Sequence, residues 1–144
     1  MQNKGFTLIE VLLSISAIAI IAGISIPVYQ SIQNRNDLDI AATTIAQSLR
    51  RAQVLSRSVD SDTTSGVYVQ SGSVTIFHGA SYATRDTTVD EIFQISPTIT
   101  LGGVSQIVFS KMTGLPTSTG TITLTSITNE TRNITINSKG MVNY

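Results

Sequence analysis

Residues 4–13 read Lys-Gly-Phe-Thr-Leu-Ile-Glu-Val-Leu-Leu, and they open an apolar run that decides how the chain is organised. The 24 residues from 6 to 29 carry one charge, that of Glu10. As a helix this run would extend about 36 Å, and the hydrocarbon core of a bilayer is about 30 Å thick. The run therefore predicts a transmembrane helix at residues 6–29.

A cleaved secretory signal peptide is the ordinary alternative for an apolar N-terminus. Such peptides carry an apolar region of about 7–15 residues, followed by a cleavage site of the small-x-small type. The apolar run here is longer, and no clear site of that kind precedes Pro27. We therefore favour a membrane anchor that stays on the mature protein.

Residues 5–10, Gly-Phe-Thr-Leu-Ile-Glu, resemble the processing signature of type IV prepilins and type II secretion pseudopilins. The resemblance implies that prepilin peptidase cuts between Gly5 and Phe6, so that residues 1–5 are a leader peptide. It also implies that Phe6 is N-methylated and that Glu10 is the fifth residue of the mature chain. The combination of glycine, aromatic residue, glutamate and apolar run makes this motif highly specific.

The charges at this end of the chain have a physical role of their own. Lys4 favours a cytoplasmic N-terminus by the positive-inside tendency, which places the rest of the chain outside. The amine freed at Phe6 is a cation among packed helices, and Glu10 is the nearest anion that can compensate it, in the same subunit or a neighbour. Glu10 is thus a candidate assembly residue. The alternative is that its carboxylate only snorkels to the membrane interface.

A second helical pattern follows the membrane run and predicts an amphipathic stalk at residues 30–60. Pro27, where the family usually carries a proline, leaves the Gly23 carbonyl without its helical partner and marks a candidate kink or unwinding point. The stalk has an apolar stripe with a 4-3-4-3 spacing, opposite a polar face. The stripe is Leu38, Ala42, Ile45, Leu49 and Ala52, with Val59 on the same face.

The arginines of the stalk invite a nucleic-acid hypothesis. Arg50, Arg51 and Arg57 form a basic group that could contact DNA phosphates. A charged helix face is more often solvated surface, and nine Lys and Arg balance nine Asp and Glu over the whole chain. DNA is therefore a partner that the composition does not favour.

From residue 67 the apolar period changes from 3.6 to 2, which predicts a β-rich domain at residues 61–144. A hairpin is expected at 67–69 and 74–77, a loop at 80–90, and short strands at 92–95, 98–101, 106–110, 121–126, 132–137 and 141–143. The predicted class is α+β: a long N-terminal helix, transmembrane in its first half and amphipathic in its second, packed on a small antiparallel sheet. This is the fold that the resemblance to type IV prepilins implies.

The C-terminal half also resembles the GspH/FimT family of minor pseudopilins and minor pilins, in residues 107–110, 120–124, 132–136 and 139–142 and in Ser-Leu-Arg-Arg-Ala-Gln at 48–53. These motifs are less specific than the processing site, and Met141 stands where the family often has an arginine. The resemblance implies a structural subunit of a type II secretion or type IV pilus filament. Its partners would be other pilin or pseudopilin subunits, prepilin peptidase and an assembly platform in the bacterial inner membrane. A DNA-binding minor pilin for natural transformation is the alternative.

No pattern in the sequence predicts catalysis, a cofactor or a metal. The one histidine, His78, has no carboxylate at a telling spacing, and there is no cysteine for a disulfide. Residues 60–66, Asp-Ser-Asp-Thr-Thr-Ser-Gly, resemble a calcium loop at a glance but lack the further ligands and closing glutamate of an EF-hand. We read them as a polar segment that ends the helix, and we expect no enzyme activity.

Overall fold

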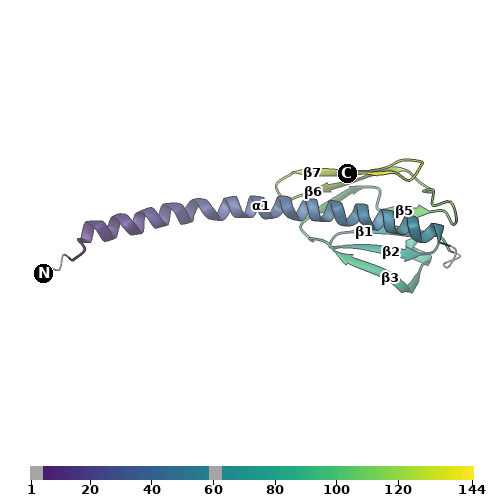
Figure 1. Ribbon diagram of the computed structural model, residues 1–144, viewed down its shortest axis with the longest axis horizontal. Coiled ribbons are helices and arrows are strands. Elements are labelled where there is room, and N and C mark those ends of the chain that lie inside the picture. The colour runs from purple at the N-terminus through teal and green to yellow at the C-terminus, as the bar shows by residue number, and fades with distance from the viewer. Residues whose placement is uncertain (1–4, 59–62) are drawn as a thin grey trace. The chain divides into compact units, whose positions relative to one another are not determined.

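The computed structural model describes residues 5–58 and 63–144, except for the side chains of residues 25–27. The chain forms two compact units, Met1–Gln33 and Asn34–Tyr144. One helix, α1 (Leu8–Arg57), contributes residues to both units (Figure 1). Every strand of the described chain belongs to the second unit.

In the second unit, α1 buries the apolar stripe that the sequence predicted. Each of its five described members is at most 2% exposed: Leu38, Ala42, Ile45, Leu49 and Ala52. Ala41 and Ala46 widen the buried face, whereas Gln47 and Arg50 on the other side stay exposed. The amphipathic pattern is therefore confirmed, with Val59 lying outside the described residues.

In the described part of the chain, eight strands form two antiparallel sheets. Sheet A has the order β3-β2-β1-β5, and sheet B has the order β4-β6-β7-β8. The strands of sheet A are β1 (Ser65–Gln70), β2 (Ser73–His78), β3 (Asp86–Gln94) and β5 (Gln106–Phe109). Those of sheet B are β4 (Thr100–Gly103), β6 (Gly120–Thr125), β7 (Thr131–Ile136) and β8 (Val142–Asn143).

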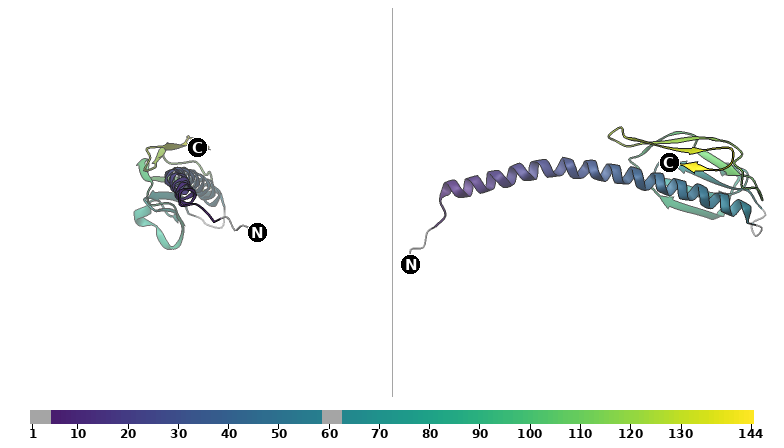
Figure 2. Two further views of the ribbon diagram at one scale, coloured as in Figure 1. Left: turned by 90° about the vertical axis from the view of Figure 1, so that its left-hand side faces the viewer. Right: turned by 45° about the horizontal axis from the view of Figure 1, so that its top comes forward.

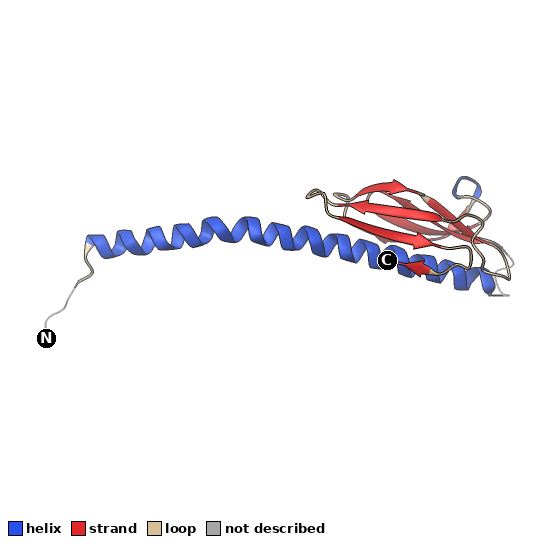
Figure 3. Ribbon diagram, turned by 90° about the horizontal axis from the view of Figure 1, so that it is seen from above, coloured by secondary structure: helices blue, strands red, loops and turns tan. Residues whose placement is uncertain are grey.

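Both sheets pack against the C-terminal half of α1, as Figures 2 and 3 show from two sides. One apolar cluster joins the three layers. It contains the helix stripe, Val67, Ile76 and Ile107 from sheet A, and Ile122 and Ile134 from sheet B. The second unit thus has a hydrophobic core of its own, made from helix and strands together.

The other face of sheet A carries a smaller aromatic cluster. Tyr82, in the short 3-10 helix η2 (Tyr82–Thr84), stacks on Tyr68 with ring centroids 3.9 Å apart and meets Phe77 edge-on at 5.7 Å. The Arg85 guanidinium lies over the Tyr82 ring at 3.7 Å and binds Asp90 at 2.8 Å. The 3-10 segment therefore covers this face, which explains why Phe77 is fully buried although it lies outside the main core.

Ion pairs and loop contacts hold the helix to the sheets at two levels. Near its entry to the second unit, Arg35 binds Glu130 and Asp39 binds Arg132, both at 2.9 Å. Near its C-terminus, the carbonyl oxygens of residues 113 and 114 accept hydrogen bonds from Arg57 Nε (3.1 Å) and Gln53 Nε2 (2.9 Å), and the amide of Met112 donates to the Ser56 carbonyl (2.8 Å).

Gly140 lies against the same end of the helix. Its φ is +77°, and a Cβ there would collide with the Gln53 amide nitrogen. A side chain at residue 140 would therefore be strained in backbone and in packing.

Two strand boundaries and the arrangement of the strands in sheets differ from the sequence-based expectation. β3 begins at Asp86, inside the predicted loop at 80–90, and β1 begins at Ser65, inside the predicted polar segment at 60–66. The strands form two sheets instead of one. The polar side chains of β3 hid this edge strand, and alternation within a strand does not say which strands pair. The α+β class itself is confirmed, with a long N-terminal helix packed on small antiparallel sheets.

Candidate assembly and processing site

Gly5 and Phe6 lie before α1 and are exposed. A Cβ built on Gly5 would meet no described atom within 4 Å. Packing in the described chain therefore does not require a glycine here. Phe6, next to it, is 83% exposed.

Thr7 and Glu10 form the start of α1. The Glu10 amide donates to the Thr7 carbonyl at 3.1 Å and lies 3.4 Å from Thr7 Oγ1. Their spacing, Thr-x-x-Glu with Thr7 directly before the first helical residue, is that of a capping box. Glu10 also lies in the first turn, where a negative charge interacts favourably with the helix dipole.

The capping role of Thr7 was not predicted from the sequence. The signal was present, because a threonine followed three residues later by glutamate and then by an apolar run is typical of a helix start. The structure therefore adds Thr7 to the candidate site residues.

The apolar part of α1 in the first unit is exposed on all sides. In its most apolar 18-residue window no residue is buried, and by length and composition α1 is the one helix of the described chain able to cross a membrane. Large apolar side chains such as Leu13, Ile18 and Ile24 are each more than half exposed. Such a surface needs lipid or other apolar helices around it.

Glu10 lies on this apolar surface. It lines a shallow hollow together with Thr7, Ile9, Leu13, Ser14 and Ala17. The hydroxyl of Ser14 donates to the Glu10 carbonyl at 2.7 Å, so this polar group is satisfied within the helix. The Glu10 carboxylate is the one charged side chain in the membrane-length run.

Pro27 lies in a part of α1 whose side chains are outside the description. The backbone of residues 25–27 is helical, and α1 continues through it to Arg57. The predicted kink or unwinding at Pro27 stays a prediction.

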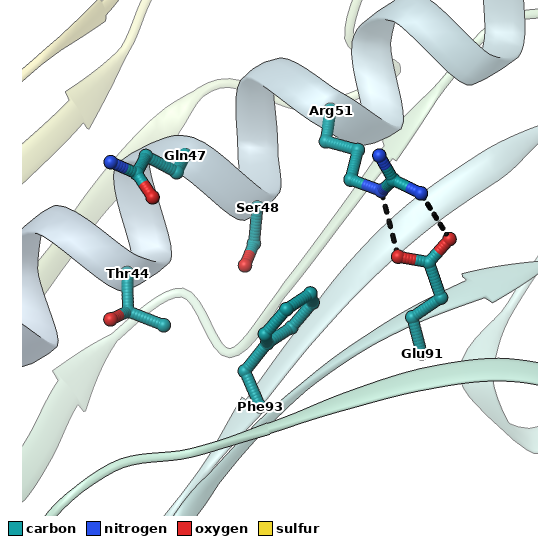
Figure 4. A pocket seen from close by; sticks show the side chains of 6 residues that line it. All are labelled: Thr44, Gln47, Ser48, Arg51, Glu91 and Phe93. Carbon is teal, nitrogen blue, oxygen red and sulfur yellow. Dashed lines mark hydrogen bonds and ion pairs between the residues drawn. The ribbon is translucent and has the colours of Figure 1, made fainter.

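The three arginines considered for DNA binding have different surroundings. Arg51 makes a bidentate ion pair with Glu91, with both N–O distances 2.7 Å (Figure 4). This contact lowers the pKa of the Glu91 carboxyl, chiefly through the hydrogen bond from Arg51. Arg57 donates to the Thr113 carbonyl, and the Arg50 guanidinium lies 5.5 Å from the ring centre of Tyr144.

Polar groups elsewhere do not assemble into a metal centre among the described residues, where no cluster of three His, Cys, Asp or Glu side chains occurs. His78 Nδ1 lies 3.3 Å from the hydroxyl of Thr63 and 3.4 Å from that of Ser65, which accounts for one side of its ring. The histidine is half-buried at the end of β2.

Comparison with known protein families bears on the N-terminus. Residues 1–26 match the family described as the prokaryotic N-terminal methylation motif. A motif of this kind is the prepilin signal of type IV pilin-like proteins. The match covers Gly5, Phe6, Thr7 and Glu10, and together with the long helix on antiparallel sheets it supports the resemblance to type IV pilins and pseudopilins.

The rest of the chain has no such support. No significant match was found among curated proteins or among solved structures. The finer resemblance to the GspH/FimT family thus stays a proposal. The methylation motif indicates a structural subunit, a class that is typically non-enzymatic.

Proposed function

We propose that this protein is a minor pseudopilin or minor pilin, a structural subunit of a type II secretion or type IV pilus filament. The observation that carries the proposal is the methylation motif at residues 1–26, followed by a membrane-length apolar helix and a second unit with its own core. The motif supports processing by prepilin peptidase. The apolar helix supports an anchor in the inner membrane before assembly.

In this proposal the glycine of the processing site is required by the peptidase and not by the fold. Gly5 has no packing reason to be glycine in the described chain. A peptidase that binds the backbone closely at the scissile bond would supply that reason. Cleavage between Gly5 and Phe6 then removes residues 1–5, and Phe6 becomes the methylated first residue.

The amine freed at Phe6 needs a compensating anion, which Glu10 can supply. Phe6 is two residues before the first residue of α1, so its ammonium group lies near the positive end of the helix dipole, which disfavours a cation. In an apolar environment an unpaired charge costs several kcal/mol. The Glu10 carboxylate compensates the amine, in its own subunit or in a neighbour, and so fixes how the helices assemble.

The contacts of the arginines do not favour DNA uptake as the main function. Arg51 is neutralised by Glu91, and Arg57 is engaged with a backbone carbonyl. A phosphate site would have to break the first contact or share the second. DNA binding is retained as an alternative to be tested, with Arg50, Arg51 and Arg57 as its residues.

Mass spectrometry of the protein from its native membrane tests the proposal. The expected mature chain begins with N-methylated Phe6. A mature chain that begins at Met1, or at a residue beyond Pro27, would overturn it. If the mature chain does begin at Phe6, co-purification with subunits of a secretion machine or of a pilus would distinguish the two kinds of filament.

A further inference from the structure

The four edges of the two sheets differ in how well they are protected. The outer edge of β5 is covered, because Thr117 donates to the Val108 carbonyl and Ser110 donates to the Leu115 carbonyl. β4 is four residues long and β8 two. β3 is nine residues long and contains no proline, lysine or arginine; its charged side chains, which also guard an edge against pairing, are Asp86, Asp90 and Glu91.

The register of β3 on β2 shows which backbone groups point to the free edge. The Ile95 amide donates to the Gly72 carbonyl at 3.0 Å, and the same register continues with Phe93 opposite Val74. Hydrogen-bonded and non-hydrogen-bonded pairs alternate along an antiparallel ladder. Phe93 and Glu91 are therefore bonded to β2, whereas the N–H and C=O groups of Ile92 and Gln94 point away from it.

The regular part of this edge is short. Between the pairs Ile76–Glu91 and His78–Asp86 the register shifts, and residues 87–90 face Phe77 alone. Regular edge geometry is thus confined to residues 91–94. Within it, Ile92 is 58% and Phe93 is 38% exposed.

Phe93 also borders a groove between β3 and α1. The groove encloses about 360 Å³ and is lined by Thr44, Gln47, Ser48, Arg51, Glu91 and Phe93. Figure 4 shows the Phe93 ring pointing toward Ser48, with the Arg51–Glu91 ion pair beside it. The aromatic side chain therefore lies at the sheet edge with open space beside it.

We propose that the free edge of β3 is a self-association site, where β3 of a second copy pairs antiparallel about a two-fold axis at Phe93. Ile92 then lies opposite Gln94 of the second copy, and Gln94 lies opposite its Ile92. The outward N–H and C=O groups of these residues form four inter-chain hydrogen bonds. The interface is self-complementary, as a two-fold axis requires.

Registers centred on the neighbouring residues fit less well. A two-fold at Ile92 would place Gln94 opposite Asp90, which lies in the irregular stretch. A two-fold at Gln94 would place Ile92 opposite Ser96, beyond the end of β3. In the register centred on Phe93, the residues that form the inter-chain hydrogen bonds, Ile92 and Gln94, both lie in the regular part of β3.

Charge and packing favour the same register. Glu91 lies opposite Ile95 of the second copy, so no carboxylate faces another carboxylate. The two Phe93 side chains form a non-hydrogen-bonded pair, the closer kind of cross-strand pair, on the face that borders the grooves. An aromatic pair in this position stabilises antiparallel strands.

The association is independent of the proposed function. A two-fold axis reverses the direction of β3 and with it the direction of α1 in the second copy. Subunits of a single polar filament share one direction. This contact joins copies that point in opposite directions, so it does not lie within one such filament. Failure of the β3 contact would leave the proposed filament role untouched.

The chain has no cysteine, so single cysteines report on this interface cleanly. We would purify full-length Phe93→Cys in detergent and measure the rate of disulfide-linked dimer formation under mild oxidation. Cα atoms of a non-hydrogen-bonded pair are about 4.5 Å apart, within the range that a disulfide spans. The control is Val89→Cys, 46% exposed in the wild-type chain and on the same strand. Its two copies would be about 27 Å apart in extended strands paired at Phe93.

The expected result is cross-linking of Phe93→Cys at least about tenfold faster than Val89→Cys, given this difference in distance. Adding Ile92→Pro should abolish the difference, because proline removes an edge amide that does not bond to β2 and is tolerated on edge strands. Equal rates for the two cysteines, or a fast rate that survives Ile92→Pro, would overturn the proposal. Sedimentation of the unmodified chain provides a second measurement: a concentration-dependent dimer is expected, and Ile92→Pro should remove it.

Discussion

Arg51 on α1 and Glu91 on β3 share a bidentate ion pair across the groove, with both N–O distances 2.7 Å. The pair joins the helix to the edge strand, 40 residues away in sequence. It is also the contact that removes one arginine from the basic group of the stalk.

This pair should contribute to acid sensitivity. The pKa of Glu91 is lowered in the folded chain by the hydrogen bond from Arg51, so the unfolded chain binds more protons in acid. The contribution of the pair to the free energy of unfolding is fully present above the ordinary glutamate pKa. It is lost as the pH falls through the lower pKa of Glu91 in the folded chain. Glu130 is shifted in the same direction by Arg35. Unfolding midpoints of wild type and Glu91→Gln, measured from about pH 7 down to pH 3, should converge in acid. A constant difference at every pH would contradict this assignment.

Leu49→Ala should destabilise the second unit strongly. The side chain is fully buried between α1 and the sheets, and truncation of a buried leucine costs about 2–5 kcal/mol. Val54→Ala is the matched control, because Val54 is on the same helix but 65% exposed. Its free energy of unfolding should change by no more than about 0.5 kcal/mol. Chemical unfolding followed by circular dichroism measures both. Similar losses for the two variants would show that the stripe is not the main contact.

Gly5→Val should leave the fold unchanged and block processing. A side chain at residue 5 meets nothing in the described chain, so a loss of cleavage would come from the peptidase alone. Gly23→Ala is the control, since a Cβ there also meets nothing within 4 Å, and this variant should be processed normally. Co-expression with prepilin peptidase and a gel-shift readout of the leader decide the matter. Normal cleavage of Gly5→Val would remove the glycine from the processing site.

Glu10→Ala should be inserted and cleaved but not assembled. Removing a charge from the apolar run makes insertion at least as favourable, and the glycine and its apolar successor remain for the peptidase. Assembly should fail because the Phe6 amine loses its compensating anion, and Glu10→Gln should be intermediate at best. The measurement is the fraction of processed protein that enters filaments when partner subunits are present. Full incorporation of Glu10→Ala would favour the simple snorkelling of the carboxylate.

DNA binding by the full-length chain in detergent should be weak at physiological salt. Arg51 is ion-paired and Arg57 bonds to a carbonyl, so a phosphate site would rest largely on Arg50. Gel shifts at several salt concentrations test this. Strong binding, with a salt slope that falls by about one unit for each arginine changed to alanine, would instead support the uptake function.

The sequence predicts the helical part of this protein better than the sheets. The helix stripe could be read because Leu38, Ile45 and Leu49 repeat with the helical period. β3 could not be read, because Asp86, Thr87 and Thr88 are exposed at a sheet edge and carry no apolar alternation. Its place next to β2 is fixed by pairing across the chain, which local patterns do not encode.

The candidate site residues show the same difference between local patterns, which the sequence reveals, and distant contacts, which it does not. Gly5, Phe6 and Glu10 are close in sequence and could be found as a motif. The Arg51–Glu91 pair joins residues far apart in sequence, so the basic group at residues 50–57 looked more available than its contacts make it.

The attachment of α1 to the sheets also has a mechanical consequence. Its contacts are spread along the helix, from Arg35 and Asp39 at one end, through the buried stripe, to Gln53 and Arg57 at the other. A force that pulls α1 along its axis would strain these contacts in shear, all at once and not one after another. We expect single-molecule pulling on the second unit to show one rupture at high force, whereas a series of small steps would show that the helix peels away. A subunit held in this way can transmit tension through its helix without losing its sheets.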